Sequence, residues 1–157
     1  MQTFLPFPDF RETARVLDRR RLGSQRVEAM QLFNALTVPG HGYRHHPAAK
    51  MWQGCEEAIV RYTLTMCDEW TTRGYSDSVA GTITDNARDR LGLVKVRTQA
   101  QLARARKLPK WLGDEEFHRA HQSNLLRKDP DHYREFFGDV PLDLDYVWPT
   151  RASAPSA

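Results

Sequence analysis

The stretch Leu17–Leu36, LDRRRLGSQRVEAMQLFNAL, joins a charged half to an amphipathic half. The second half has apolar residues at helical spacing, which predicts a helix with one buried face. These residues are Leu22, Val27, Ala29, Met30, Phe33 and Leu36. At about 3.6 residues per turn, Arg21, Gln25 and Glu28 project to nearly the same side of that helix. A carboxylate near several arginines indicates either a solvated surface of charge pairs or a surface that binds phosphates while the acid acts on a sugar.

The composition limits the class of protein. The chain has 157 residues and a formal net charge of +3, which fits one domain with an ordinary core. It contains no apolar run of about 18 residues, the length of a membrane-spanning helix, and its first residues lack the features of a secretory signal. Cys55 and Cys67 lie too far apart on one predicted helix to form a disulfide, so both fit buried thiols in a reducing compartment. We therefore expect a cytoplasmic protein, and a monomer.

The hydrophobic periodicity predicts an all-α fold: a compact single domain of three main helices plus short helices and long loops. Asp9 can cap a first helix, which we expect to break near Gly23 and continue to Leu36. Pro47 can begin a second helix, in which large apolar residues alternate at spacings of three and four up to Trp70. Further helices are predicted at residues 85–91, 98–107, 114–128 and 130–137. We assign residues 1–149 to this domain and residues 150–157 to a disordered C-terminal tail.

Basic residues concentrate at positions 11–26, 88–110 and 127–134. If these clusters converge in the fold, they form a surface that binds phosphates. In the last cluster, Arg127 and Lys128 follow the amide and hydroxyl groups of Gln122, Ser123 and Asn124, which also suit phosphate oxygens. The alternative is an amphipathic helix whose polar side only faces solvent.

Four histidines are the other candidates for chemistry. His45 and His46 precede Pro47, where they could cap a helix, contact a phosphate or bind a metal. His118 and His121 stand three residues apart on one helix, a spacing that can chelate a metal, and His45 or His46 could complete three ligands. No HExxH-type arrangement accompanies them, so we predict no metal and no cofactor.

Three blocks of the sequence together resemble the pyrimidine-dimer DNA glycosylase family, the small UV-repair endonucleases typified by the phage enzyme endonuclease V. The blocks are L-D-x-x-x-L-x-x-x-x-x-E from Leu17 to Glu28, H-P-x-x-x-M-W from His46 to Trp52, and H-x-x-x-x-S-x-L-x-x-K-D-P-x-x-Y from His118 to Tyr133. They cover most of residues 1–138, and a bacterial branch of the family is more similar to this chain than the phage enzyme is.

The resemblance implies a compact helical fold whose own α-amino group lies at the active site. In the family this amine attacks the sugar C1′ of a nucleotide flipped from the duplex and forms a Schiff base, and elimination then cleaves the strand. A glutamate on the first long helix assists, and Glu28 matches it by its distance from Asp18 and Leu22. An α-amine has an ordinary pKa of roughly 7.7–8.0, so part of it is a free nucleophile near neutral pH.

The chain departs from the phage enzyme at its first residues. That enzyme exposes a threonine after its initiator methionine is removed, whereas here Gln2 follows Met1, and a bulky second residue normally protects methionine from removal. Either the Met1 amine is the nucleophile, or the chain uses water with Glu28 as base and does not cleave the strand.

We therefore predict a DNA glycosylase, with AP-lyase activity if the amine is used, that excises a damaged or modified pyrimidine by base flipping and N-glycosidic bond cleavage. Glu28 and Met1 are the predicted catalytic residues, and the partner is double-stranded DNA carrying the damaged base. The predicted DNA-binding residues are Arg20, Arg21, Gln25, Arg26, His45, His46, His118, His121, Arg127 and Lys128. The alternatives are a nucleic-acid-binding module without catalysis and a histidine-metal-dependent hydrolase.

Overall fold

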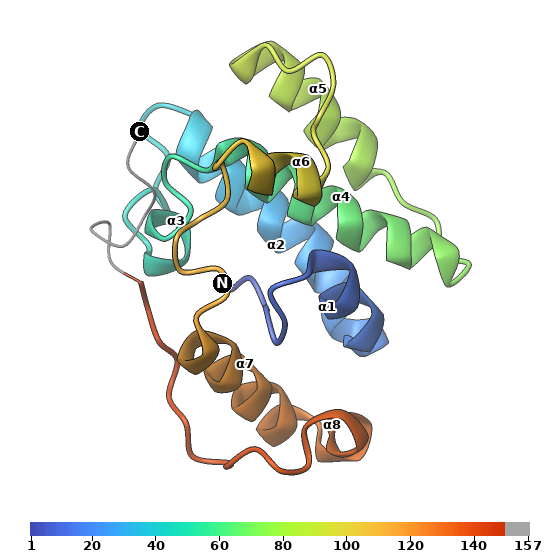
Figure 1. The fold of residues 1–157 in the computed structure, drawn as a ribbon. Coiled ribbons are helices and arrows are strands. Elements are labelled where there is room, and N and C mark those ends of the chain that lie inside the picture. The colour runs from blue at the N-terminus through green and yellow to red at the C-terminus, as the bar shows by residue number, and fades with distance from the viewer. Residues whose placement is uncertain (150–157) are drawn as a thin grey trace.

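The computed structural model describes residues 1–149, which form eight α-helices and no strand (Figure 1). This confirms the predicted all-α fold. The helices are α1 (Phe10–Val16), α2 (Arg19–Thr37), α3 (Pro47–Lys50), α4 (Glu56–Thr72), α5 (Val79–Leu91), α6 (Gln99–Arg104), α7 (Glu115–Lys128) and α8 (Pro130–Phe137). The predicted C-terminal tail, residues 150–157, lies outside the described residues. No helix within residues 1–149 is long and apolar enough to cross a lipid bilayer.

The two longest helices form the centre of the fold. α2 packs along α4, α1 and α5 also contact α4, and α7 pairs with α8. The predicted apolar face of α2 is buried at Leu22, Ala29 and Phe33, and α4 contributes Ile59 and Tyr62, all with 0% exposure. Burial of the larger of these side chains, such as Leu22, Phe33 and Ile59, contributes roughly 1.5–3 kcal/mol each. Met30 and Leu36 are partly buried, but Val27, predicted on the same face, is 39% exposed, so the buried face of α2 is narrower than the periodicity predicts.

Several predicted helix boundaries were wrong. The helix predicted at residues 85–91 begins six residues earlier, at Val79, and the one predicted at residues 98–107 ends at Arg104. The first helix breaks at Leu17 and Asp18, and Gly23 lies inside α2. A Cβ atom at Gly23 would lie 3.1 Å from the Trp70 ring, so glycine is there because the ring packs closely against it. The second predicted helix is divided into α3 and α4 by a turn that includes Gly54, whose φ is +88°.

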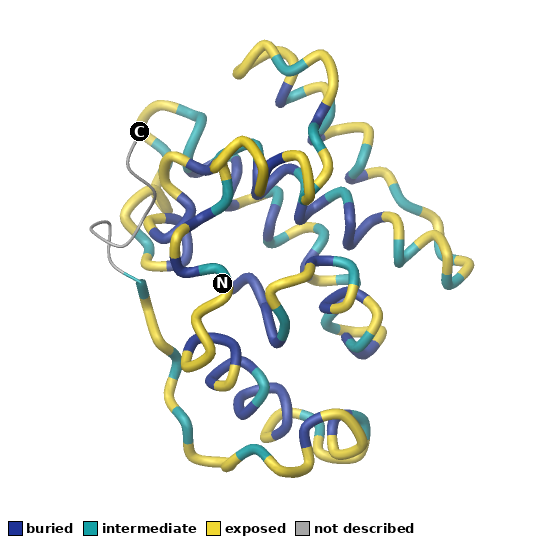
Figure 2. The backbone as a smooth tube through the Cα atoms, viewed as in Figure 1, coloured by how far each residue is buried: buried dark blue, intermediate teal, exposed yellow. Residues whose placement is uncertain are grey.

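The N-terminal segment, residues 1–9, forms no helix or strand, bends at residues 6–9, and lies between α7 and the layer that contains α2 and α4 (Figure 1). Residues 2–6 are buried although they belong to no helix or strand (Figure 2). Buried backbone groups need hydrogen-bond partners, and side chains of the neighbouring helices provide them. These side chains are Gln25, Tyr62, Gln99, His118, His121 and Gln122. The fold therefore fixes the position of the first residues.

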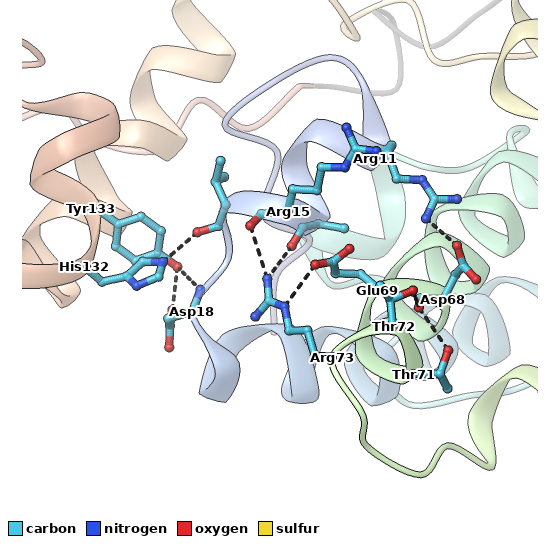
Figure 3. Close-up of polar contacts among 12 residues, drawn as sticks. Arg11, Arg15, Asp18, Asp68, Glu69, Thr71, Thr72, Arg73, His132 and Tyr133 are labelled. Atoms are coloured by element: carbon cyan, nitrogen blue, oxygen red, sulfur yellow. Dashed lines mark hydrogen bonds and ion pairs between the residues drawn. The ribbon is translucent and has the colours of Figure 1, made fainter.

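The start of α2 is held by α8, and the end of α1 is held by Arg73 at the end of α4 (Figure 3). Asp18 caps α2 by accepting from the backbone N–H of Arg21 at 3.3 Å. The Tyr133 hydroxyl donates to the Asp18 carboxylate and accepts from the Asp18 backbone N–H at 3.0 Å. Burial alone would raise the pKa of Asp18, but hydrogen bonds from Tyr133 and Arg21 hold it below its ordinary value. Arg73 donates to two carbonyl groups at the end of α1, so hydrogen bonds hold both sides of the junction between α1 and α2.

The C-terminal segment, residues 138–149, runs back along α7 toward the amino terminus (Figure 1). Leu144 fixes it, because its N–H donates to the Ser123 hydroxyl at 3.2 Å and its carbonyl accepts from the Asn124 side chain at 3.2 Å. The segment brings Tyr146 and Trp148 to the hollow at the start of the chain.

Candidate active site

A cavity of about 410 Å³ lies at the amino terminus. It is within the range of roughly 300–1,000 Å³ that is usual for ligand pockets. Five parts of the chain line it: the N-terminal segment, α2, the residue before α3, the end of α7 and the C-terminal segment. The lining residues are Met1, Gln2, Phe4, Glu28, His46, Lys128, Tyr146 and Trp148.

The structure brings the two predicted catalytic groups to this one cavity. The Glu28 carboxylate is half-buried rather than enclosed in the core. Its Oε2 accepts from the backbone N–H of Gln2 at 3.4 Å and from Gln25 Nε2 at 3.2 Å. Met1 is bonded to Gln2 and lines the same cavity, so the start of the chain and the carboxylate of Glu28 share one cavity.

A second, shallower hollow of about 670 Å³ lies on the other side of Glu28. Its basic residues are Arg19 and Arg20, both exposed, at the start of α2. Trp70 closes one side, with its ring packed against Gly23. Glu28 can therefore be reached from an arginine-lined surface as well as from the cavity at the amino terminus. The predicted acid and two of the arginines beside it thus line one hollow.

His46 and Lys128 supply further polar groups at the cavity. His46 caps α3, because its Nδ1 accepts from the backbone N–H of Ala48 at 3.0 Å. Burial lowers the pKa of His46, and the positive charge of the nearby Met1 amino group lowers it further. The neutral ring then carries its proton on Nε2, so His46 is a hydrogen-bond donor. Lys128 is exposed at the end of α7 and adds a positive charge.

Three residues predicted to contact DNA lie in the protein interior. Gln25 is 0% exposed, His118 is 5% and His121 is 1%. Their polar atoms bond the backbone of Gln2, Phe4 and Leu5. A buried side chain cannot contact a duplex. The prediction that these three residues contact DNA was therefore wrong. These three side chains of α2 and α7 meet the buried N-terminal segment instead of solvent.

Two predicted DNA-binding arginines are engaged within the protein. Arg26 pairs with Asp77, and its guanidinium carbon lies 4.5 Å from the centroid of the Trp70 ring. Arg127 donates to the Leu144 carbonyl at 3.0 Å and so holds the C-terminal segment. Neither arginine lines the two hollows beside Glu28.

The remaining predicted DNA contacts lie at different places. Arg20 is exposed beside Glu28, and Arg21 is half-buried and pairs with Asp18 at 3.2 Å. His45 is exposed, but it lines a separate hollow of about 860 Å³ between the end of α2 and α3. The structure therefore gathers Arg20, His46 and Lys128 around Glu28 and leaves His45 apart.

Sequence reasoning missed Tyr146 and Trp148, which form an aromatic wall of the cavity with ring centroids 5.7 Å apart. The sequence signal for them is a pair of large aromatic residues two positions apart, after three aspartates at positions 139–145. Within residues 1–149 no group of three or more His, Cys, Asp or Glu side chains could hold a metal ion.

The fold and this site define a helical protein in which one carboxylate faces the chain's own start beside basic side chains. The sequence model of the pyrimidine dimer DNA glycosylase family matches residues 1–80, about half of the chain, and the chain belongs to that family. The matched residues include Met1, Glu28 and His46. Family membership indicates a DNA glycosylase that acts on DNA. No curated protein and no solved structure matches the chain.

Proposed function

We propose that this protein excises a damaged or modified pyrimidine from double-stranded DNA, and that the α-amine of Met1 and the carboxylate of Glu28 carry out the reaction. The observation that supports this most directly is the bond of 3.4 Å between Gln2 N and Glu28 Oε2, since it brings the start of the chain to the acid. We also propose that the protein acts as a cytoplasmic monomer, with Cys55 and Cys67 as buried free thiols.

The reaction begins when the damaged nucleotide leaves the stack and its deoxyribose enters the cavity. The lone pair of the Met1 amine forms a bond to C1′, and the electrons of the glycosidic bond leave with the base, which takes up a proton. Glu28 accepts a proton from the attacking amine and stabilises the positive charge that develops on the sugar. Opening of the sugar ring gives the Schiff base, and loss of a C2′ proton then expels the 3′ phosphate.

The geometry favours the amine as nucleophile because the chain's start does not have to be ordered during the reaction. Residues 2–6 are already fixed by hydrogen bonds to α2, α4 and α7. Orientation of this kind can supply roughly 7–11 kcal/mol of a barrier at best.

We propose that Arg20, His46 and Lys128 hold the DNA around the flipped nucleotide. The two cations are exposed and flank Glu28, where they can neutralise phosphates, and the His46 ring can donate one hydrogen bond. Lys128→Ala should weaken binding to damaged and undamaged duplexes alike and reduce the salt slope of log K by about 1. Lys95→Ala, an exposed lysine outside both hollows, should leave the salt slope unchanged in a fluorescence anisotropy titration.

Oligonucleotides that each carry one defined lesion test the proposal. The protein should release the base from at least one pyrimidine lesion and become covalently attached to that oligonucleotide in borohydride. Glu28→Gln should retain binding and lower the rate of base release by about 10²–10⁴-fold. Glu135→Gln, an exposed acid on α8, is the matched control and should behave as the wild type. Binding without base release from any lesion would favour the non-catalytic module.

A further inference from the structure

One buried side chain bonds both the start of the chain and the Glu28 carboxylate. Gln25 is 0% exposed, and its Nε2 donates to Gln2 O at 2.9 Å and to Glu28 Oε2 at 3.2 Å. Its Oε1 accepts from the backbone N–H of Phe4 at 2.9 Å and lies 2.6 Å from the Tyr62 hydroxyl. The single hydrogen of the Tyr62 hydroxyl is shared between Gln25 Oε1 and Phe4 O, which lies 2.7 Å away. The amide N–H groups face two acceptors and its oxygen faces the Phe4 N–H donor, so the side chain has one favourable orientation.

The carboxylate of Glu28 is held through one of its two oxygens. Gln25 Nε2 and Gln2 N both donate to Oε2, at 3.2 and 3.4 Å. In the part of the chain that the structure describes, these are the two hydrogen bonds that the carboxylate receives, so Oε1 keeps its lone pairs for a substrate. One amide therefore determines how far the carboxylate lies from the first peptide groups of the chain.

We propose that Gln25 is a positioning residue, which fixes the Glu28 carboxylate relative to the α-amine of Met1. This inference rests on the proposed function and extends it. Gln25 does not touch DNA, and it acts through Glu28 and through the N-terminal segment. Positioning of this kind matters because a displacement of about 1 Å can lower an enzyme's rate about 10²-fold.

Other titratable groups also face Glu28 from the elements around it. They are the Met1 amine, Arg19, Arg20, His46, Tyr62, Lys128 and Tyr146. Burial raises the pKa of Tyr62 well above its ordinary value, and the charge of Glu28 raises it further, so the Tyr62 hydroxyl stays a donor. A substitution at position 25 changes none of these side chains chemically, so a pH dependence that changes in Gln25→Glu but not in a control substitution at another contact of the N-terminal segment can be assigned to that position.

Two substitutions at Gln25 separate positioning from folding. Gln25→Glu keeps the shape and the Oε1 acceptor but directs a second carboxylate oxygen at Glu28. Two carboxylates this close share one proton, so the acidic limb of the pH–rate profile should move to higher pH by roughly one unit or more. Gln25→Met removes the hydrogen bonds to the N-terminal segment and to Glu28. Single-turnover base release should then be about 10²-fold slower, with lesion DNA bound as tightly as by the wild type.

Gln122→Glu is the matched control. Gln122 Nε2 donates to Pro6 O at 2.8 Å, so it holds the same segment through the same chemical group without contacting Glu28. Rates are normalised to the folded fraction measured by circular dichroism. A shifted pH limb in Gln25→Glu and an unshifted one in Gln122→Glu supports the positioning role. The inference is overturned if an active protein shows the same pH profile in both variants.

A second readout does not depend on activity. The Glu28 side-chain carboxyl carbon can be followed by ¹³C NMR as the pH is changed in the wild type and both variants. If the wild type releases no base from any lesion, the proposed function fails, and this titration still decides the role of Gln25. A midpoint raised in Gln25→Glu alone supports the link between the two side chains, and equal midpoints in all three proteins overturn it.

Discussion

Acidification should release the N-terminal segment, because two buried histidines hold it in their neutral forms. Leu5 N–H donates to His121 Nδ1 at 3.0 Å, so that nitrogen carries no proton. Gly113 N–H donates to His118 Nε2 at 2.9 Å, so His118 carries its proton on Nδ1 and donates to Leu5 O at 2.7 Å. Protonation of His121 Nδ1 would remove an acceptor and place a charge in the core.

The pKa shifts give the sign and the size of this effect. Burial lowers the pKa of both histidines, and the neighbouring His118 contributes to lowering that of His121 to about 3. The unfolded chain, with an ordinary histidine pKa of roughly 6.5, therefore binds more protons, and stability falls as the pH falls below that value. From pH 7 to pH 5, His121 alone should lower the free energy of unfolding by about 2 kcal/mol. Asp18 and Asp77 also have lowered pKa values, but the stability that they provide is lost only at more acidic pH, where aspartates take up protons.

Urea unfolding at pH 7, 6 and 5 measures the effect. His121→Asn keeps an acceptor near Leu5 N–H but cannot titrate, so its stability should change with pH by about 2 kcal/mol less than the wild type over this range. His45→Asn, an exposed loop residue, is the control and should retain the dependence of the wild type. An identical pH dependence in the wild type and His121→Asn would refute the reasoning.

Two further predictions concern the elements that position the site. Tyr133→Phe leaves the buried backbone N–H of Asp18 without its partner and should lower the free energy of unfolding by about 1–3 kcal/mol in urea; no change would show that water replaces the hydroxyl. Gly23→Ala places a methyl group 3.1 Å from the Trp70 ring and should destabilise by roughly 1–3 kcal/mol despite the better helix propensity of alanine. Gly81→Ala on α5 meets no atom within 4 Å and should stabilise by up to about 1 kcal/mol, so a thermal melt in which both alanines raise Tm would contradict the packing argument.

Local chemistry allowed part of the fold to be predicted from the sequence. Asp114 accepts from the backbone N–H of Glu116 and caps α7, and Pro130 begins α8, so both helices run as predicted. The first helix boundary could not be predicted in the same way. The unfavourable propensity of Gly23 is offset by packing against Trp70, 47 positions later, which spacing along the chain does not reveal.

The candidate site was predictable where the resemblance specified a role and not where it depended on distant contacts. Glu28 was identified by its spacing from Asp18 and Leu22, and in the structure its carboxylate accepts a hydrogen bond from Gln2, near the start of the chain. His121 and Gln25 were expected on a solvent-facing surface because polar residues at helical spacing usually are. His121 accepts from Leu5, 116 positions away, and Gln25 accepts from Phe4, 21 positions away. A buried segment that forms no helix or strand has no hydrophobic periodicity from which its burial could be predicted.

The most direct test of the central claim is to locate the covalent bond between protein and DNA. The complex trapped by borohydride on a lesion oligonucleotide is digested with nuclease and protease, and the modified peptide is identified by mass spectrometry. The account predicts that the sugar remnant is attached to the α-amine of Met1 and that Glu28→Gln greatly reduces the yield. A remnant on a lysine side chain, or a full yield with Glu28→Gln, would contradict it.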